Sequence, residues 1–212
     1  MEKPENYLLM SGAVRTLYAQ DLKDFVSSRT IDLTDLILVV CKRVGTQAVP
    51  QRVLTANDHL SLLDRRQLGS GSDKQVGYMV NMSAARPFRF ESRFRLGDHV
   101  SEIATTVDIY FHVLDADKVV RNLDQDPLRQ LCDEIRAELR KFFKRIARYQ
   151  DVGDRLGEAE ALAGAIGDRP VLGLALEQVT IDYELPEEVR KSLEGIVGRQ
   201  IERDLEDQKR LD

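Results

Sequence analysis

The chain has 212 residues, with 42% apolar and 32% charged side chains and a formal charge of −5. This composition is typical of a soluble globular protein, and the length suits one large domain or one and a half ordinary ones. An acidic chain produces no overall field that attracts nucleic acid, so we expect no nucleic-acid partner. Two cysteines are too few for a disulfide framework, which favours a reducing, cytoplasmic setting.

The longest strongly apolar run is Leu36 to Cys41, which is six residues long. A membrane helix needs about 20 such residues, and the first residues show no signal-peptide pattern. The sequence therefore predicts no transmembrane segment and a cytoplasmic chain whose membrane contact, if any, is peripheral.

Residues 1–86 form a segment to which the sequence assigns no fold, although we expect it to pack with the rest. Residues 16–27 have a loose helical pattern. Residues 30–44 leave two interpretations open: a helix that begins near Thr34, or a buried strand made of the dense apolar run. Residues 75–82 predict a strand.

A glycine- and serine-rich stretch lies at residues 69–74. Glycine-rich loops can bind phosphate, but this one lacks the spacing of a phosphate-binding loop and does not join a clear strand to a clear helix. We therefore expect a flexible hairpin tip or a surface loop there.

A second strand is predicted for residues 87–96, where phenylalanines alternate with arginines. Its polar face would carry Arg89, Arg93 and Arg95 side by side. Two interpretations remain open. The arginines form a solvated face balanced by Glu91 and by acids on a neighbouring strand, or they bind an anionic partner, either phospholipid headgroups or an acidic protein.

The clearest strand covers residues 103–113, and we expect it to pair antiparallel with residues 87–96. Asp108 would then lie across from one of the arginines. His112 has no cysteine or second histidine near it in sequence, so no metal site is predicted.

Asp126 and Pro127 are typical of a helix start, and an apolar stripe continues to Ile146. We therefore expect one helix from Asp126 to about Arg148. Its last two turns are strongly basic and contain Arg140, Lys141, Lys144, Arg145 and Arg148. These cations either complement the helix dipole or form a patch that faces lipid or a partner.

Residues 174–183 predict a final strand, with Leu174, Leu176 and Thr180 on one face and Val179 and Ile181 on the other. A Leu-Pro hinge follows, and residues 186–210 predict an exposed helix. Such a helix needs a cover for its apolar stripe, and self-association as a coiled coil is the natural candidate. The stripe consists of Val189, Leu193, Ile196, Val197, Ile201 and Leu205.

Two stretches resemble the SPFH (band 7) domain, the module shared by stomatin, prohibitin, flotillin and their bacterial relatives. The first is the strand at residues 103–114 with the Asp-Ala-Asp-Lys-Val-Val exit that follows it. The second is the run Glu-Gln-Val-Thr-Ile-Asp-Tyr-Glu-Leu-Pro-Glu-Glu-Val-Arg-Lys-Ser-Leu-Glu within residues 174–199. The resemblance covers roughly residues 90–205, about half of the chain.

This resemblance implies an α+β fold. An SPFH-like core at residues 87–185 would have an antiparallel or mixed sheet packed by helices, and the C-terminal helix at residues 186–212 would begin a coiled coil. Because that coiled coil continues further in the family, we expect a truncated or short-tailed relative. The N-terminal membrane helix or hairpin of many members has no counterpart here.

No enzyme motif is present, and we expect neither a cofactor nor a catalytic or metal site. The resemblance implies an oligomerising scaffold, associated with membrane proteins or anionic lipid patches. The alternative is a monomeric regulatory adaptor that binds an acidic protein or ligand through the arginine-rich strand and the basic helix end. The partner, the lipid and the oligomer size stay open.

Overall fold

A computed structural model describes residues 6–27, 35–44, 47–55, 58, 75–83, 86–98, 101–184, 187 and 191. The strands are β1 (Val14–Leu17), β2 (Leu36–Val44), β3 (Gln47–Leu54), β4 (Gln75–Asn81), β5 (Arg86–Arg95), β6 (Glu102–Val113) and β7 (Leu174–Glu184). The helices are α1 (Tyr7–Met10), α2 (Ala19–Ser27), α4 (Ala116–Arg121), α5 (Pro127–Phe143), α6 (Gln150–Asp154) and α7 (Leu156–Gly164), with a 3-10 turn η1 (Leu123–Gln125).

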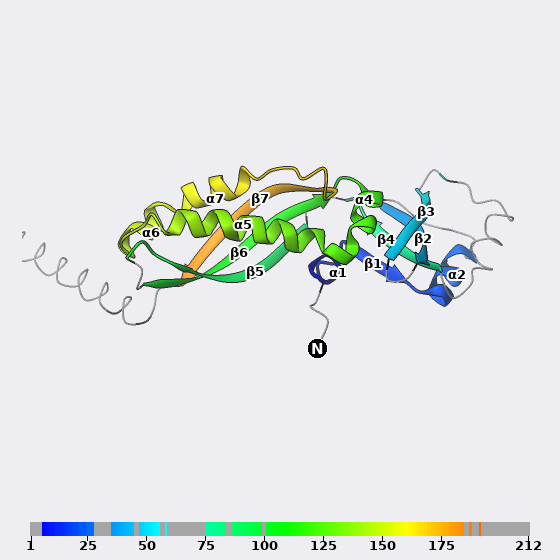
Figure 1. Cartoon of the computed structure of the whole chain (residues 1–212), viewed down its shortest axis with the longest axis horizontal. Helices are drawn as coiled ribbons and strands as arrows, with labels where there is room; N and C mark the ends of the chain where they lie inside the picture. The colour runs from blue at the N-terminus through cyan, green and yellow to red at the C-terminus, as the bar shows by residue number, and fades with distance from the viewer. Residues whose placement is uncertain are drawn as a thin grey trace, which may run out of the picture.

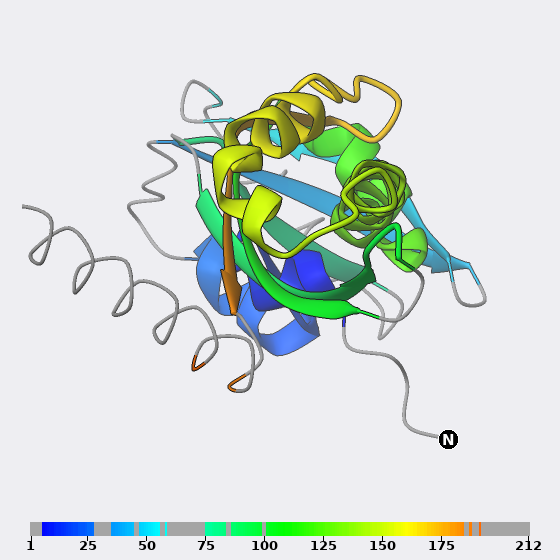
Figure 2. The same cartoon turned by 90° about the vertical axis from the view of Figure 1, so that its left-hand side faces the viewer.

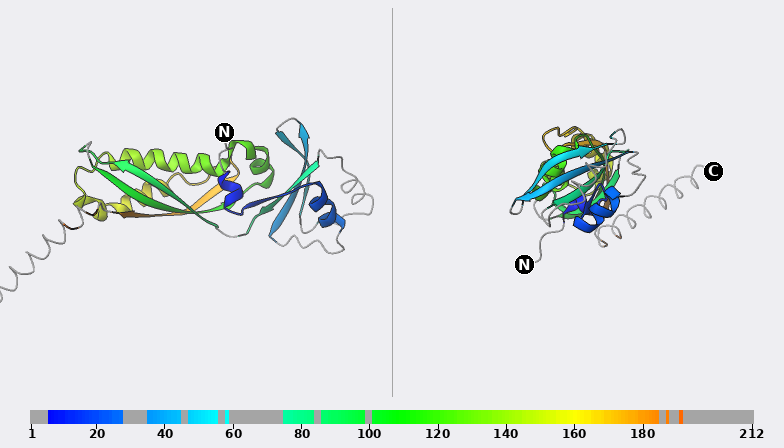
Figure 3. Two further views of the ribbon diagram at one scale, coloured as in Figure 1. Left: turned by 90° about the horizontal axis from the view of Figure 1, so that it is seen from below. Right: turned by 90° about the vertical axis from the view of Figure 1, so that its right-hand side faces the viewer.

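This part of the chain is an α+β fold with two antiparallel sheets, one of order β1-β4-β2-β3 and one of order β5-β6-β7. The sheets lie at opposite ends of an elongated molecule, with α1 and α4 between them (Figure 1). Helix α2 covers the far end of the four-stranded sheet, and α6 lies at the opposite end of the molecule (Figure 3).

The four-stranded sheet is built from the segment that the sequence left unassigned. Its strand β2 confirms the strand interpretation of the apolar run, and the helix interpretation is wrong. Alternate residues of β2 belong to two hydrophobic clusters. Leu38 and Val40 pack in a small cluster with α2, whereas Val39 and Cys41 belong to the larger cluster that forms the main core of the protein. Residues 16–27 divide between β1 and α2, so only their second part is helical.

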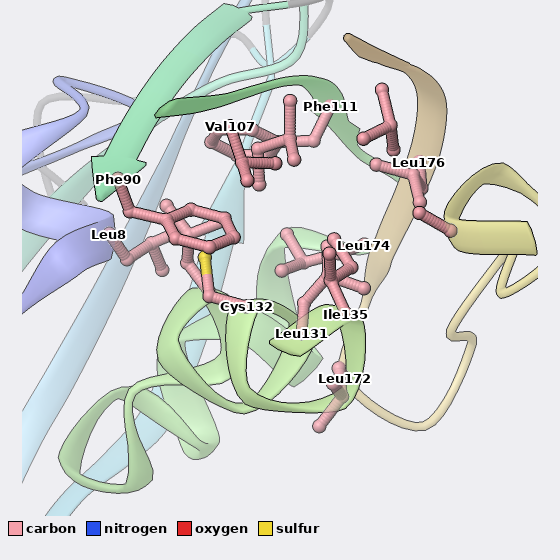
Figure 4. Close-up of a cluster of buried hydrophobic side chains, with 14 of the residues drawn as sticks. Leu8, Phe90, Val107, Phe111, Leu131, Cys132, Ile135, Leu172, Leu174 and Leu176 are labelled. Carbon is pink, nitrogen blue, oxygen red and sulfur yellow. The ribbon is translucent and has the colours of Figure 1, made fainter. Parts of the chain in front are cut away.

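Strands β5 and β6 form the expected antiparallel pair, and β7 pairs with the other side of β6. Helices α5 and α7 cover one face of this three-stranded sheet (Figure 2). Figure 4 shows the core between them, where Val107 and Phe111 of β6 face Leu131 and Ile135 of α5. Within the described residues no helix packs on the other face, which carries the polar side chains of all three strands.

The final strand is confirmed, but its predicted facing is wrong. Leu174 and Leu176 share the buried face with Val179 and Ile181, because the β6–β7 register shifts between Tyr110 and Phe111. This irregularity leaves Glu177 and Gln178 both exposed. Because of this extra residue, strict alternation placed Leu174 and Leu176 on the opposite face from Val179 and Ile181.

Helix α5 begins as predicted, with the Asp126 side chain accepting a hydrogen bond from the amide of Arg129. It ends at Phe143, however, and not near Arg148. The chain turns there because Ile146 folds back into the core, where it is 1% exposed, and its carbonyl accepts a 2.7 Å hydrogen bond from the amide of Gly97. No glycine or proline marks this end in the sequence, so the prediction followed the apolar periodicity and made the helix too long.

The predicted C-terminal helix and its stripe lie outside the described residues, except for Glu187 and Lys191, which form an exposed ion pair one helical turn apart. The loop at residues 69–74 also lies outside them. No helix in the described part of the chain is both long and apolar enough to cross a bilayer.

Candidate functional site

The arginine face consists of Arg89, Arg93 and Arg95, which project from β5 on the side of the sheet that no described helix covers. Arg89 donates from Nε and Nη2 to the two carboxylate oxygens of Asp108, at 2.8 Å each. Arg95 donates from Nε to Glu102 over the same distance. The expected pairing of Asp108 with an arginine is thus confirmed, and two of the three arginines are balanced within the chain.

The hydrogen bonds from Arg89 lower the pKa of Asp108 below its ordinary value of 3.8. Asp108 stays ionised at neutral pH, so the pair holds its charge. Because the Arg89 side chain is 68% exposed, water and salt screen the interaction, and it contributes little to stability.

Arg93 differs from its two neighbours because the residue opposite it on β6 is Ala104. The structure shows no ion pair for Arg93 with any residue that it describes. Beside it lies a depression of about 400 Å³. Its polar side chains come from Glu91 and Arg93 on β5, Thr106 on β6 and Glu184 at the end of β7.

The basic end is the name we give to Arg140, Lys141, Lys144, Arg145 and Arg148. All five side chains are exposed, but only the first two belong to α5, since the others follow its end. Lys141 forms a 2.6 Å ion pair with Glu138. The other four have no ion pair with any part of the chain that the structure describes, so their charge is available to an outside anion.

The tertiary structure brings the arginine face next to the basic end. The turn after β5 packs on the turn after α5, through the hydrogen bond from the Gly97 amide to the Ile146 carbonyl. The hydroxyl of Tyr149 also donates a 2.8 Å hydrogen bond to the carbonyl of Glu102, whose side chain holds Arg95. Two stretches that are about 50 residues apart in sequence therefore form one end of the molecule.

Two other arginines of α5, Arg129 and Arg136, pack against α1 and β5. The guanidinium of Arg136 lies 4.5 Å from the ring centre of Phe90, and that of Arg129 lies 4.7 Å from the ring centre of Tyr7. Asp126 joins them, since its carboxylate accepts a 2.8 Å hydrogen bond from the amide of Tyr7. Sequence reasoning missed this cluster because residues before 87 had no assigned position.

Neither cysteine offers a reactive thiol. Both cysteines are fully buried, and burial raises the pKa of Cys41 and of Cys132 to about 12, so neither thiol is a nucleophile near neutral pH. In the same part of the chain no group of histidine, cysteine or acidic side chains is placed to hold a metal ion. What the site can do is attract anions.

In comparisons with known proteins, no protein-family model and no curated protein matches the chain.

Proposed function

We propose that this chain is a non-catalytic, SPFH-like scaffold that docks on anionic lipid through its basic end and self-associates through its C-terminal segment. In this way it organises membrane proteins or lipid patches. The observation that carries the proposal is the group of four exposed cations, Arg140, Lys144, Arg145 and Arg148, without ion pairs in the described chain.

The order of elements supports the family part of the proposal. Residues 103–120 form a strand followed by a helix, as the resembled pattern requires, and the Asp115 side chain caps that helix at the amide of Lys118. The last strand, β7, then leads towards the Leu-Pro hinge.

The charge near the basic end is large enough to matter in a chain of net charge −5. Residues 140–154 contain five basic and two acidic side chains. A lysine or arginine near an anionic leaflet contributes about 1 kcal/mol. The four available cations would therefore contribute up to about 4 kcal/mol, roughly a thousandfold in partitioning.

The place where β7 ends favours several copies acting together. Glu184, the last residue of β7, pairs with Ala104 beside the arginine face, so the C-terminal segment leaves from the end of the molecule that carries the basic residues. Copies joined through the stripe from Val189 to Leu205 would present several basic ends at once. Linked weak contacts of this kind strengthen binding without new interactions.

Vesicle co-sedimentation tests the lipid contact. The double variant Lys144→Glu/Arg145→Glu should lose at least about tenfold in binding to vesicles that contain phosphatidylserine. The matched control is Lys42→Glu/Arg43→Glu, which changes an equally exposed Lys-Arg pair on β2, at the other end of the molecule, by the same charge. Equal losses in the two variants would show that net charge, and not the basic end, governs binding.

Sedimentation velocity over a concentration series tests self-association. Oligomers that disappear in Leu193→Asp support the scaffold. A chain that is monomeric at all concentrations favours the second candidate, a monomeric adaptor for an acidic protein or ligand. The observation that favours this adaptor is Arg93, which has no ion pair in the described structure and stands beside the depression on β5.

A further inference from the structure

Strand β5 is an edge strand, because the order β5-β6-β7 leaves one of its sides without a neighbouring strand. The hydrogen bond from the Leu96 amide to the Ser101 carbonyl, at 2.9 Å, continues the register in which Arg95 faces Glu102. In an antiparallel pair, hydrogen-bonded and non-hydrogen-bonded positions alternate. Even-numbered residues of β5 therefore bond to β6, and the backbone groups of Arg89, Glu91, Arg93 and Arg95 point away from it.

Two further observations agree with this assignment. The carbonyl of Ser92 points towards β6, since it accepts a 3.1 Å hydrogen bond from Oγ1 of Thr105. Pro87, which has no amide hydrogen to donate, falls on an odd position, where the pairing with β6 needs none.

The two edges of the sheet are treated differently. On β7, helix α7 packs against the strand, and the carboxylate of Glu160 accepts a 2.9 Å hydrogen bond from the amide of Ile181. On β5, no described residue forms a hydrogen bond with the outward amides of Arg89, Glu91, Arg93 or Arg95. Within the described chain, one outward amide of the β7 edge is therefore bonded by a side chain, whereas these four amides of the β5 edge are open.

The side chains of the same outward residues determine what this edge attracts. The arginines stand on the outermost strand, where Arg89 and Arg95 are 68% and 69% exposed. Asp108 lies on the strand behind and is only 17% exposed. A segment that approaches the edge therefore meets arginine first, and the basic end adds positive charge near Arg95.

We propose that the open edge of β5 binds an extended acidic segment of another protein as an added antiparallel strand. Carboxylates of that segment would lie opposite Arg89, Arg93 and Arg95, with an uncharged residue opposite Glu91. Backbone pairing supplies affinity in this mode of recognition, and side-chain sites along the strand supply specificity.

A second copy of the chain fits this edge less well. Two β5 strands related by a two-fold axis at Glu91 would overlap over most of their length. That pairing opposes Arg89 to Arg93 twice and Glu91 to itself, and like charges directly opposite each other are destabilising. With the axis at Ser92 instead, Glu91 faces Arg93, but Arg89 opposes Arg95 twice. An acidic partner has no such conflict. Strand addition itself uses the outward amides of β5, whereas lipid binding uses the basic end.

The experiment titrates the full chain with a capped peptide that contains Glu-Thr-Glu-Thr-Thr-Thr-Glu, followed by amide NMR and hydrogen exchange. Its control carries lysine in place of each glutamate. We expect the acidic peptide to slow exchange of the amides of Arg89, Glu91, Arg93 and Arg95 at least tenfold, and to leave the already protected even-numbered amides unchanged. The lysine peptide should produce no protection.

A pair of variants at Glu91 separates backbone pairing from charge. Glu91→Thr removes an acid and keeps the outward amide, so the peptide should bind as tightly as to the wild type or more tightly. Glu91→Pro removes the same acid and also the amide, without breaking a hydrogen bond to β6, and should weaken binding at least tenfold relative to Glu91→Thr.

Several results would overturn the proposal. Binding of the acidic peptide without protection of the outward amides, or equal affinity for both Glu91 variants, would mean simple charge attraction. If the acidic peptide does not bind, or if the lysine peptide gives equal protection, an acidic partner is ruled out. A dimer abolished by Glu91→Pro would identify a second copy as the occupant. Exchange on the wild-type chain decides the question even if the proline variant fails to fold.

Discussion

The contact between the turns after β5 and α5 leaves no room for a side chain at Gly97. A Cβ atom added there would lie 2.6 Å from the backbone carbonyl oxygen of Lys144 and 3.3 Å from that of Ile146. Both neighbours are backbone atoms, so relief requires the two turns to separate. Gly97→Ala should therefore weaken the hydrogen bond from Gly97 to Ile146 and loosen the packing of the basic end.

The size of this effect follows from three contributions. Overpacking costs typically 1–3 kcal/mol, so about 2 kcal/mol is expected for one methyl group against backbone. A weakened hydrogen bond adds about 1 kcal/mol. Alanine also lowers the conformational entropy of the unfolded chain, which offsets about 0.4–1 kcal/mol of this loss. The net loss of about 2 kcal/mol should lower Tm by roughly 4–8 °C for a chain of this size.

Urea unfolding and thermal melting measure this loss, and Gly157→Ala is the matched control. A Cβ atom at Gly157 would have no neighbour within 4 Å, and the residue lies in α7, where alanine is favoured over glycine by about 0.5–1 kcal/mol. We expect the two alanine variants to shift stability in opposite directions. If Gly97→Ala has the same urea midpoint as the wild type, the two turns do not pack as closely as described.

Three further predictions concern buried and paired groups. Because burial raises the pKa of Cys41 and of Cys132 to about 12, a thiol reagent should label the folded chain no faster than it unfolds; rapid labelling would contradict their burial. Arg89→Gln removes the partner that lowers the pKa of Asp108. Its stability deficit in urea should be small, present at neutral pH, and lost as the pH falls through the folded-state pKa of Asp108, which lies below 3.8; a deficit that persists in acid would have another cause. Asp126→Ala removes the cap of α5 and the partner of the first amide of α1, and should cost about 2–3 kcal/mol on unfolding. Asp126→Asn should cost less than Asp126→Ala, because asparagine keeps one acceptor oxygen for one of the two amides and tolerates the left-handed backbone.

The two proposals use different cations and can fail separately. Lipid docking depends on the four available cations of the basic end, whereas strand addition depends on the outward amides of β5. Lys144→Glu/Arg145→Glu should therefore weaken vesicle binding and leave protection of the Glu91 amide by the acidic peptide in place. Glu91→Pro should have the converse effect.

Local sequence patterns were sufficient to predict the elements whose residues alternate or recur without interruption. The strands at residues 75–81 and 102–113 and the start of α5 at Asp126 were predicted, because periods of two and of 3.6 residues and a side-chain cap are local properties. The strand at residues 86–95 was predicted with its buried phenylalanines and exposed arginines. Its pairing with the strand at residues 102–113 was also predicted, because the two strands are adjacent in the chain.

The remaining features could not be predicted in this way, because each of them depends on contacts between groups far apart in sequence. The end of α5 at Phe143 is set by the burial of Ile146 and its hydrogen bond to Gly97, and the facing of β7 by a bulge opposite β6. The apolar run at residues 36–41 became a strand because β3 and β4 flank it. Whether an arginine is available to a partner is settled in the same way, by the residue on the neighbouring strand: Asp108 faces Arg89 and Glu102 faces Arg95, whereas Ala104 leaves Arg93 without a counter-charge on β6.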